Sequence, residues 1–213
     1  MARDPAAVTL VLASASPRRM ALLEQVGLAP HILCPTDVDE SPERNEVPRR
    51  LALRLATAKA QAAKMQPSVS GLPNDVYILG ADTVVALGRR ILPKAEDPET
   101  AQNCLELLSG RSHRVYTAVC LIGPGGKHHR RVVETRVRFK RFTRMDVESY
   151  LASEEWRGKA GGYAIQGRAE AFVRLISGSW SNVVGLPLHE TVNLLQGADY
   201  PVHLAWLDGP KGL

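Results

Sequence analysis

Residues 8–26 read VTLVLASASPRRMALLEQV, and this stretch decides the kind of fold to expect. Its first part, Val8 to Ala13, is an apolar run of strand length, and its last part, Met20 to Val26, has the apolar spacing of a helix. Hydroxyl and guanidinium groups fill the junction, where backbone donors and the positive end of the helix dipole also converge. The junction is therefore suited to bind an anion. Its polar residues are Ser14, Ser16, Arg18 and Arg19.

The rest of the chain alternates apolar runs of strand length with helical patterns, the order typical of an α/β protein. Two β-rich runs, 113–122 and 131–142, flank a glycine-rich turn and predict an antiparallel pair. We therefore expect a central mixed, twisted sheet that is flanked by helices. The predicted helices begin at Pro48, Thr100, Thr143 and Pro187, and Asp97 is the predicted cap of the second.

Composition limits the class of protein. With 213 residues, 45% of them apolar, the chain can form one large domain over residues 1–213, with an irregular tail from about residue 198. The net charge of +5 suits an anionic substrate but is modest for a nucleic-acid-binding protein. Three separate cysteines in apolar stretches favour buried thiols in a reducing compartment. The first apolar run is too short to span a membrane and lacks a secretory cleavage site, so we expect a cytoplasmic protein.

A second polar position follows the apolar run from Val76 to Leu79. Asp82 places a single carboxylate there, which can hold a divalent metal or take a proton from water. A turn residue after a strand would give the same pattern. No Walker or dinucleotide-binding glycine pattern occurs in the sequence, which disfavours a kinase or a dinucleotide enzyme.

Five segments occur in the order SASPRR (14–19), GADTV (80–84), LSGRSH (108–113) with TAV (117–119), KAGGYAIQG (159–167) and VGLPL (184–188). Together they resemble the Maf nucleotide pyrophosphatases. The resemblance implies the Maf architecture, which is like that of inosine triphosphatase and has an active-site cleft. It also implies hydrolysis of a nucleoside triphosphate between its α and β phosphates with a divalent metal, and a homodimer. Oxygen ligands favour Mg²⁺ or Mn²⁺ as that metal.

The resemblance also assigns roles to residues of this chain. Asp82 matches the catalytic carboxylate, described as the proton acceptor, and we expect Asp82 and Glu40 to bind the metal. Substrate binding is expected from Ser14, Ser16, Arg19, Lys59 and Lys94. The chain departs from the family at Ala95, because the family usually has proline after the second lysine.

Three further positions separate branches of the family. The branch that acts on dTTP and UTP has Arg, Thr and Gln at these positions, and this chain has Arg18, Thr83 and Gln166. The Gln166 amide offers a donor and an acceptor, which can satisfy the imide edge of uracil or thymine. The alternative is the 7-methyl-GTP branch, which has Trp after the motif proline, Gln after the catalytic Asp and Glu in place of the late Gln.

Two alternatives lie outside this chemistry. A basic nucleic-acid-binding protein would use a stripe of cations along the second β-rich run to follow phosphates, although a charged edge strand has the same pattern. A nucleotide sensor would bind a triphosphate without turnover. A triphosphate substrate is favoured over both, and neither a membrane nor a nucleic acid is an expected partner. The stripe comprises Arg130, Arg131, Arg136, Arg138, Lys140 and Arg141.

Overall fold

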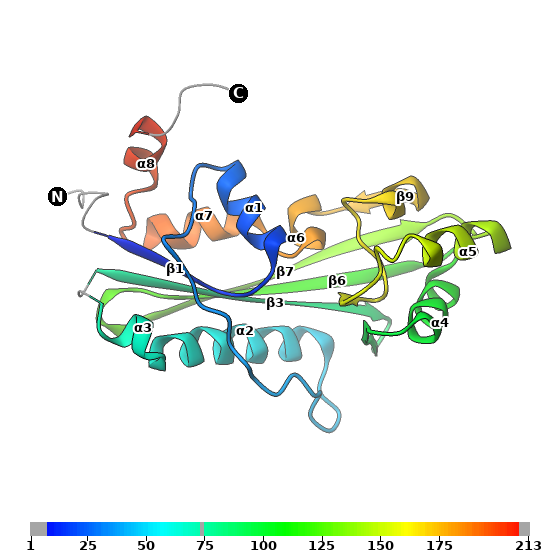
Figure 1. The fold of residues 1–213 in the computed structure, drawn as a ribbon, viewed down its shortest axis with the longest axis horizontal. Helices are drawn as coiled ribbons and strands as arrows, with labels where there is room; N and C mark the ends of the chain where they lie inside the picture. The colour runs from blue at the N-terminus through cyan, green and yellow to red at the C-terminus, as the bar shows by residue number, and fades with distance from the viewer. Residues whose placement is uncertain (1–7, 73–74, 209–213) are drawn as a thin grey trace.

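The computed structural model describes residues 8–72 and 75–208, which form a mixed sheet between layers of helices (Figure 1). The strands are β1 (Thr9–Ala13), β2 (Ile32–Leu33), β3 (Val76–Leu87), β4 (Arg90–Leu92), β5 (Lys94–Ala95), β6 (Ser112–Ile122), β7 (His128–Phe139), β8 (Lys159–Ala160) and β9 (Val173–Ser177). The helices are α1 (Pro17–Gln25), α2 (Pro48–Met65), α3 (Pro67–Ser70), α4 (Pro98–Leu108), α5 (Arg144–Ala152), α6 (Trp180–Val184), α7 (Leu188–Gly197) and α8 (Val202–Asp208), with 3₁₀ turns at Pro124–Gly126 and Arg168–Phe172.

The main sheet has the strand order β2-β1-β3-β6-β7-β9, with β4 paired to β3. β1 runs parallel to β2 and β3, whereas β3, β6, β7 and β9 pair antiparallel. The sheet is thus mixed and flanked by helices, which confirms the predicted fold class. The predicted antiparallel pair is the β6–β7 hairpin, which turns through Pro124–Gly126.

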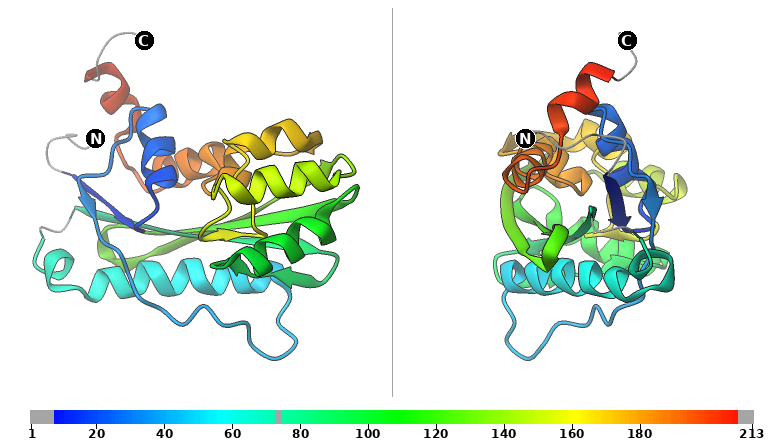
Figure 2. Two further views of the ribbon diagram at one scale, coloured as in Figure 1. Left: turned by 45° about the vertical axis from the view of Figure 1, so that its right-hand side comes forward. Right: turned by 90° about the vertical axis from the view of Figure 1, so that its left-hand side faces the viewer.

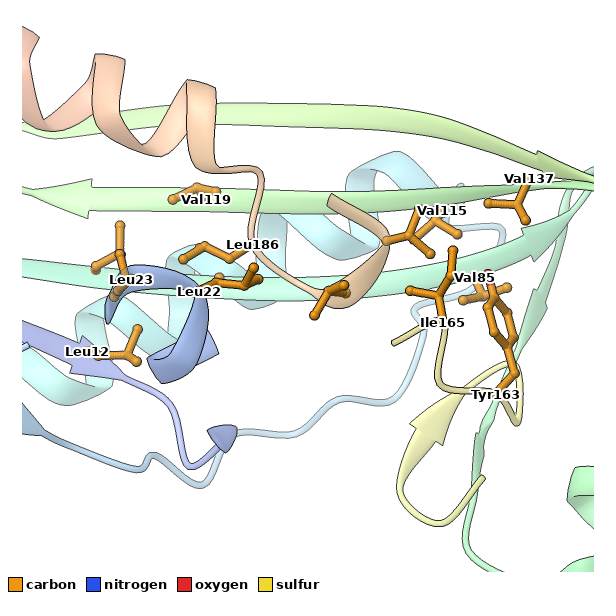
Figure 3. Close-up of a cluster of buried hydrophobic side chains, with 14 of the residues drawn as sticks. Leu12, Leu22, Leu23, Val85, Val115, Val119, Val137, Tyr163, Ile165 and Leu186 are labelled. Atoms are coloured by element: carbon orange, nitrogen blue, oxygen red, sulfur yellow. The ribbon is translucent and has the colours of Figure 1, made fainter. Parts of the chain in front are cut away.

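Helices cover both faces of this sheet (Figure 2). α2 lies along one face and buries a stripe of leucine and alanine side chains against the centre of the sheet. It can lie close because β3 has no side chain at Gly80, where a Cβ atom would stand 2.5 Å from the Ala56 carbonyl oxygen. α1, α6 and α7 cover the other face, and Figure 3 shows Leu22, Leu23 and Leu186 in the core that they form there.

Local sequence signals account for several helix ends. The Asp97 side chain accepts a hydrogen bond from the Thr100 nitrogen at 2.7 Å, which confirms the predicted cap of α4. Thr143 and Asp146 form the predicted capping box of α5. Cys34, Cys104 and Cys120 are buried and unpaired, as expected. In the described part of the chain, no helix has both the length and the apolar character needed to cross a bilayer.

Two expectations about element boundaries are wrong. The irregular tail predicted from residue 198 contains a helix instead, α8, because Val202 is buried in the main core and the Trp206 indole donates to the Val26 carbonyl oxygen at 2.6 Å. Asp82 was expected just after a strand, but β3 continues to Leu87 and places Asp82 within the strand. The strand is long because β6 pairs with it from Ile78 to Ala86.

Candidate active site

The residues that the sequence predicted for the site all line one cleft. They come from the β1–α1 junction, the segment after β2, α2, the middle of β3, β5 and the loop that follows β8. Segments far apart in the sequence therefore meet at one place. The predicted residues are Ser14, Ser16, Arg18, Arg19, Glu40, Lys59, Asp82, Thr83, Lys94 and Gln166.

Arg19 is held in place by hydrogen bonds to three groups. Its Nη1 donates to Ser14 Oγ at 3.2 Å, its Nη2 to Thr83 Oγ1 at 3.2 Å, and its Nε to the Gly185 carbonyl oxygen at 2.8 Å. Ser14 also accepts from the Ser16 nitrogen at 3.1 Å, whereas the Ser16 side chain makes no capping bond to α1. The guanidinium group is thus fixed before any ligand binds.

A chain of alternating charges crosses the cleft. Lys59 Nζ contacts Asp82 Oδ1 at 2.6 Å and Glu40 Oε1 at 2.7 Å. The other oxygen of Glu40 pairs with Lys94. Lys59 and Asp82 are almost fully buried, whereas Lys94 is partly exposed. Lys59 therefore joins the two carboxylates that the sequence assigned to metal binding.

The two carboxylates have opposite pKa shifts. Burial raises the pKa of Asp82, and it outweighs the opposing charges of Lys59 and Arg19. Burial also disfavours the charged form of Glu40, but hydrogen bonds from Lys59 and Lys94 outweigh burial and lower its pKa. A raised pKa makes Asp82 the stronger base of the two, which suits it to accept a proton.

Two predicted specificity residues are available to a ligand. Gln166 is exposed, and its side-chain amide makes no hydrogen bond to any described residue. Arg18 is partly buried beside Arg19, and burial and the neighbouring charge lower its pKa. An anion beside Arg18 would relieve this repulsion.

Aromatic side chains contribute little to the cleft. Trp156 is buried in the core and donates to the Leu151 carbonyl oxygen at 2.9 Å. Trp180 is not among the residues that line the cleft, whereas Tyr163 is. Tyr163 is buried with Ile165 and Val85 (Figure 3), and its hydroxyl lies 2.8 Å from His113 Nε2. Burial lowers the pKa of His113 to about 4, so this ring is neutral at pH 7.

Comparison with known proteins identifies the family. A family model described as Maf-like protein matches residues 9–198. The chain belongs to the Maf family.

Curated relatives match this chain over most of their length. The chain is 57% identical to the dTTP/UTP pyrophosphatase of Rhodopseudomonas palustris (strain BisB5), over 93% of this chain and 96% of that protein. It is 58% identical to the dTTP/UTP pyrophosphatase of Mesorhizobium japonicum, over 93% and 95%. A solved structure of a HAM1 protein from Coxiella burnetii aligns with 94% of this chain and 98% of its own chain, at a TM-score of 0.47 and 15% identity.

The one departure from the Maf pattern leaves the site intact. Ala95 pairs with Lys159 in the small β5–β8 sheet, and the neighbouring Lys94 still reaches Glu40. This pairing also brings Lys159 into the cleft, a residue to which sequence reasoning gave no role. Burial and the charge of Arg18 lower the pKa of Lys159. A signal was present, because Lys159 opens the KAGGYAIQG segment of the Maf resemblance.

Proposed function

We propose that this chain hydrolyses dTTP and UTP to the nucleoside monophosphate and pyrophosphate. One observation carries the proposal: the buried carboxylate of Asp82 lines the same cleft as the fixed guanidinium group of Arg19. The names of the relatives, dTTP/UTP pyrophosphatase, support the same substrates.

The charge of the cleft fits a triphosphate. A triphosphate carries about four negative charges at neutral pH, and they must be met by cations placed before the reaction begins. Five cationic side chains line the cleft against two carboxylates. These cations are Arg18, Arg19, Lys59, Lys94 and Lys159.

Asp82 then acts as the general base. It accepts a proton from a water molecule as the water oxygen attacks the α-phosphorus in line, and the bond to the bridging oxygen breaks so that pyrophosphate leaves. Lys59 keeps the carboxylate oriented through its 2.6 Å contact. Arg19 and Lys94 bind the charge that gathers on the leaving group, and no covalent intermediate forms.

The donor set also fits a divalent cation. The carboxylates of Glu40 and Asp82 both contact Lys59 Nζ and therefore lie close together. The second oxygen of Asp82 makes no hydrogen bond to any described residue. In the described part of the chain no group of three or more His, Cys, Asp or Glu side chains is arranged to hold a metal ion, so these two carboxylates need substrate phosphates to complete a site, as is usual for Mg²⁺. Such a cation neutralises phosphate charge and lowers the pKa of bound water.

Specificity for uracil and thymine is assigned to Arg18, Thr83 and Gln166. All three line the cleft, and the Gln166 amide is free to pair with a base. The 7-methyl-GTP alternative is disfavoured because a neutral amide lacks the charge that suits a cationic methylated guanine. A homodimer and a cytoplasmic location remain predictions from the sequence.

The test is an assay of the purified protein on dTTP, UTP, CTP and 7-methyl-GTP with Mg²⁺ or Mn²⁺, in which pyrophosphate and orthophosphate are detected separately. Pyrophosphate released fastest from dTTP and UTP is the expected result. Orthophosphate as the first product would refute cleavage between the α and β phosphates, and faster hydrolysis of 7-methyl-GTP would refute the assigned base. Retention of random DNA at physiological salt without any pyrophosphate release would support the basic stripe on β7 instead.

A further inference from the structure

A chain of hydrogen bonds leads from the cleft into the core. Thr83 and Thr117 stand directly opposite each other on β3 and β6, with their hydroxyl oxygens 3.0 Å apart. On the cleft side, Thr83 Oγ1 accepts from Arg19 Nη2. On the core side, Thr117 Oγ1 lies 2.8 Å from the backbone oxygen of Asn182 in α6. Thr83 is partly exposed and lines the cleft, whereas Thr117 is completely buried.

The direction of every bond in this chain can be deduced. Each hydroxyl group has one hydrogen to donate. A carbonyl oxygen only accepts, so the Thr117 hydrogen points to Asn182. A guanidinium group only donates, so Thr83 must accept from Arg19. The contact between the two hydroxyls therefore uses the Thr83 hydrogen, which points into the core.

If Thr117 gave up its hydrogen bond to the Asn182 backbone oxygen, that oxygen would lose its partner. In a continuing helix the Asn182 carbonyl would accept from the Leu186 nitrogen, but that nitrogen donates to Ser181 at 2.9 Å. The helix ends there because Gly185 takes a φ of +136°, which a side chain would rarely allow. The buried carbonyl thus depends on the Thr117 hydroxyl, since buried backbone groups are costly when unpaired.

We propose that Thr117 is a positioning residue that sets base specificity: by holding the Thr83 hydrogen, it leaves Thr83 able only to accept a hydrogen bond in the cleft. A ligand must then present a donor at that point. Uracil and thymine carry a hydrogen on ring atom N3, whereas cytosine has a bare lone pair there. The inference deepens the proposed function and rests on it.

Thr83 is better suited to this discrimination than Gln166. An amide that makes no other hydrogen bond can rotate to present either its oxygen or its nitrogen. Gln166 can therefore pair with uracil or thymine and equally with cytosine. Thr83 cannot adapt, because its hydrogen is already committed to Thr117. Cytosine would place its N3 lone pair against the remaining lone pair of Thr83 Oγ1 and leave N3 without a partner in a partly buried site, which is how a polar site rejects an analogue.

The test compares kcat/KM for CTP and for UTP in wild type and in Thr117→Val. Valine matches the shape of threonine but accepts no hydrogen bond, so the Thr83 hydroxyl becomes free to donate to N3 of cytosine. We expect the CTP-to-UTP ratio to rise about fivefold, as one neutral hydrogen bond would give. Thr117→Ser keeps the hydroxyl group and should keep the wild-type ratio.

A merely structural role for Thr117 would lower both rates in proportion, and an unchanged ratio in folded Thr117→Val would overturn the inference. If that variant does not fold, Thr117→Cys replaces it, because a thiol is a weak donor and a weak acceptor. The ratio should then rise by a smaller factor, and an unchanged ratio again refutes the role. Wild-type protein that releases no pyrophosphate from UTP refutes the proposed function instead.

Discussion

Replacing Asp82 by asparagine tests the base directly. The two side chains have the same shape, and the asparagine oxygen can still accept from Lys59, which also keeps its 2.7 Å contact with Glu40. The loss is therefore confined to basicity and metal affinity. Loss of a general base lowers rates by roughly 10² to 10⁴, equivalent to about 3 to 5 kcal/mol of transition-state stabilisation. We expect kcat for UTP to fall by this factor while KM changes little.

The stability of Asp82→Asn should move in the opposite direction. Burial raises the pKa of Asp82, so the folded state binds this proton more tightly than the unfolded state. The ionised group therefore costs folding free energy as the pH rises above its ordinary value of 3.8. A neutral asparagine removes that cost, and the Tm at pH 7 should be equal to or higher than that of wild type.

The measurements are steady-state kinetics with UTP and thermal unfolding by circular dichroism. Asp199→Asn is the matched control, because Asp199 is exposed, has a positive φ that asparagine tolerates, and does not line the cleft. The acidic limb of the wild-type pH–rate profile should lie above the ordinary aspartate range and should be lost in the variant. Asp82→Asn with kcat within tenfold of wild type would refute the assignment of the base.

Three other predictions concern the frame and the rim of the site. Gly80→Ala should destabilise the fold by about 1–3 kcal/mol in urea titrations, since the new Cβ atom would meet the Ala56 carbonyl; equal midpoints would contradict this close approach. Thr143→Ala should lower the free energy of unfolding by about 1 kcal/mol, because it removes the cap of α5, and it should leave kcat unchanged. A fall in kcat would contradict the separation of this cap from the cleft. Lys94→Met should lower kcat/KM for UTP about tenfold, because Lys94 is a partly exposed cation at the cleft that binds the charge of the leaving group, and an unchanged kcat/KM would remove it from the phosphate site.

Local signals predicted the parts of the fold that are encoded locally. The strand–helix junction, the Asp97 cap and the β6–β7 hairpin each depend on neighbouring residues, and all three are present. The length of β3 was missed because it depends on pairing with β6, a distant segment. α8 was missed because its place depends on burial of Val202 in a core that no local pattern reveals.

In the candidate site, too, contacts between neighbouring residues could be predicted from the sequence, whereas contacts between distant segments could not. Ser14 and Arg19 are close in sequence, and their meeting could be expected from the junction alone. A lysine on a helix is by itself expected to be exposed, yet Lys59 is buried. It is buried because β3 passes beneath that turn of α2 and supplies Asp82 as a partner. Only the family resemblance identified it in advance, whereas the pairing of Glu40 with both lysines required the fold.

The position of Asp82 within β3 has a consequence for how the protein loses activity. β6 pairs with this strand on one side at Asp82, and on the other side β1 pairs with it up to Gly80 and β4 from Val85, so this carboxylate lies on a central strand of the sheet instead of on a loop. Fraying of an edge or a terminus leaves an interior strand untouched, since such strands open only near the global unfolding free energy. Enzyme activity and the sheet structure should therefore be lost over the same temperature range on heating.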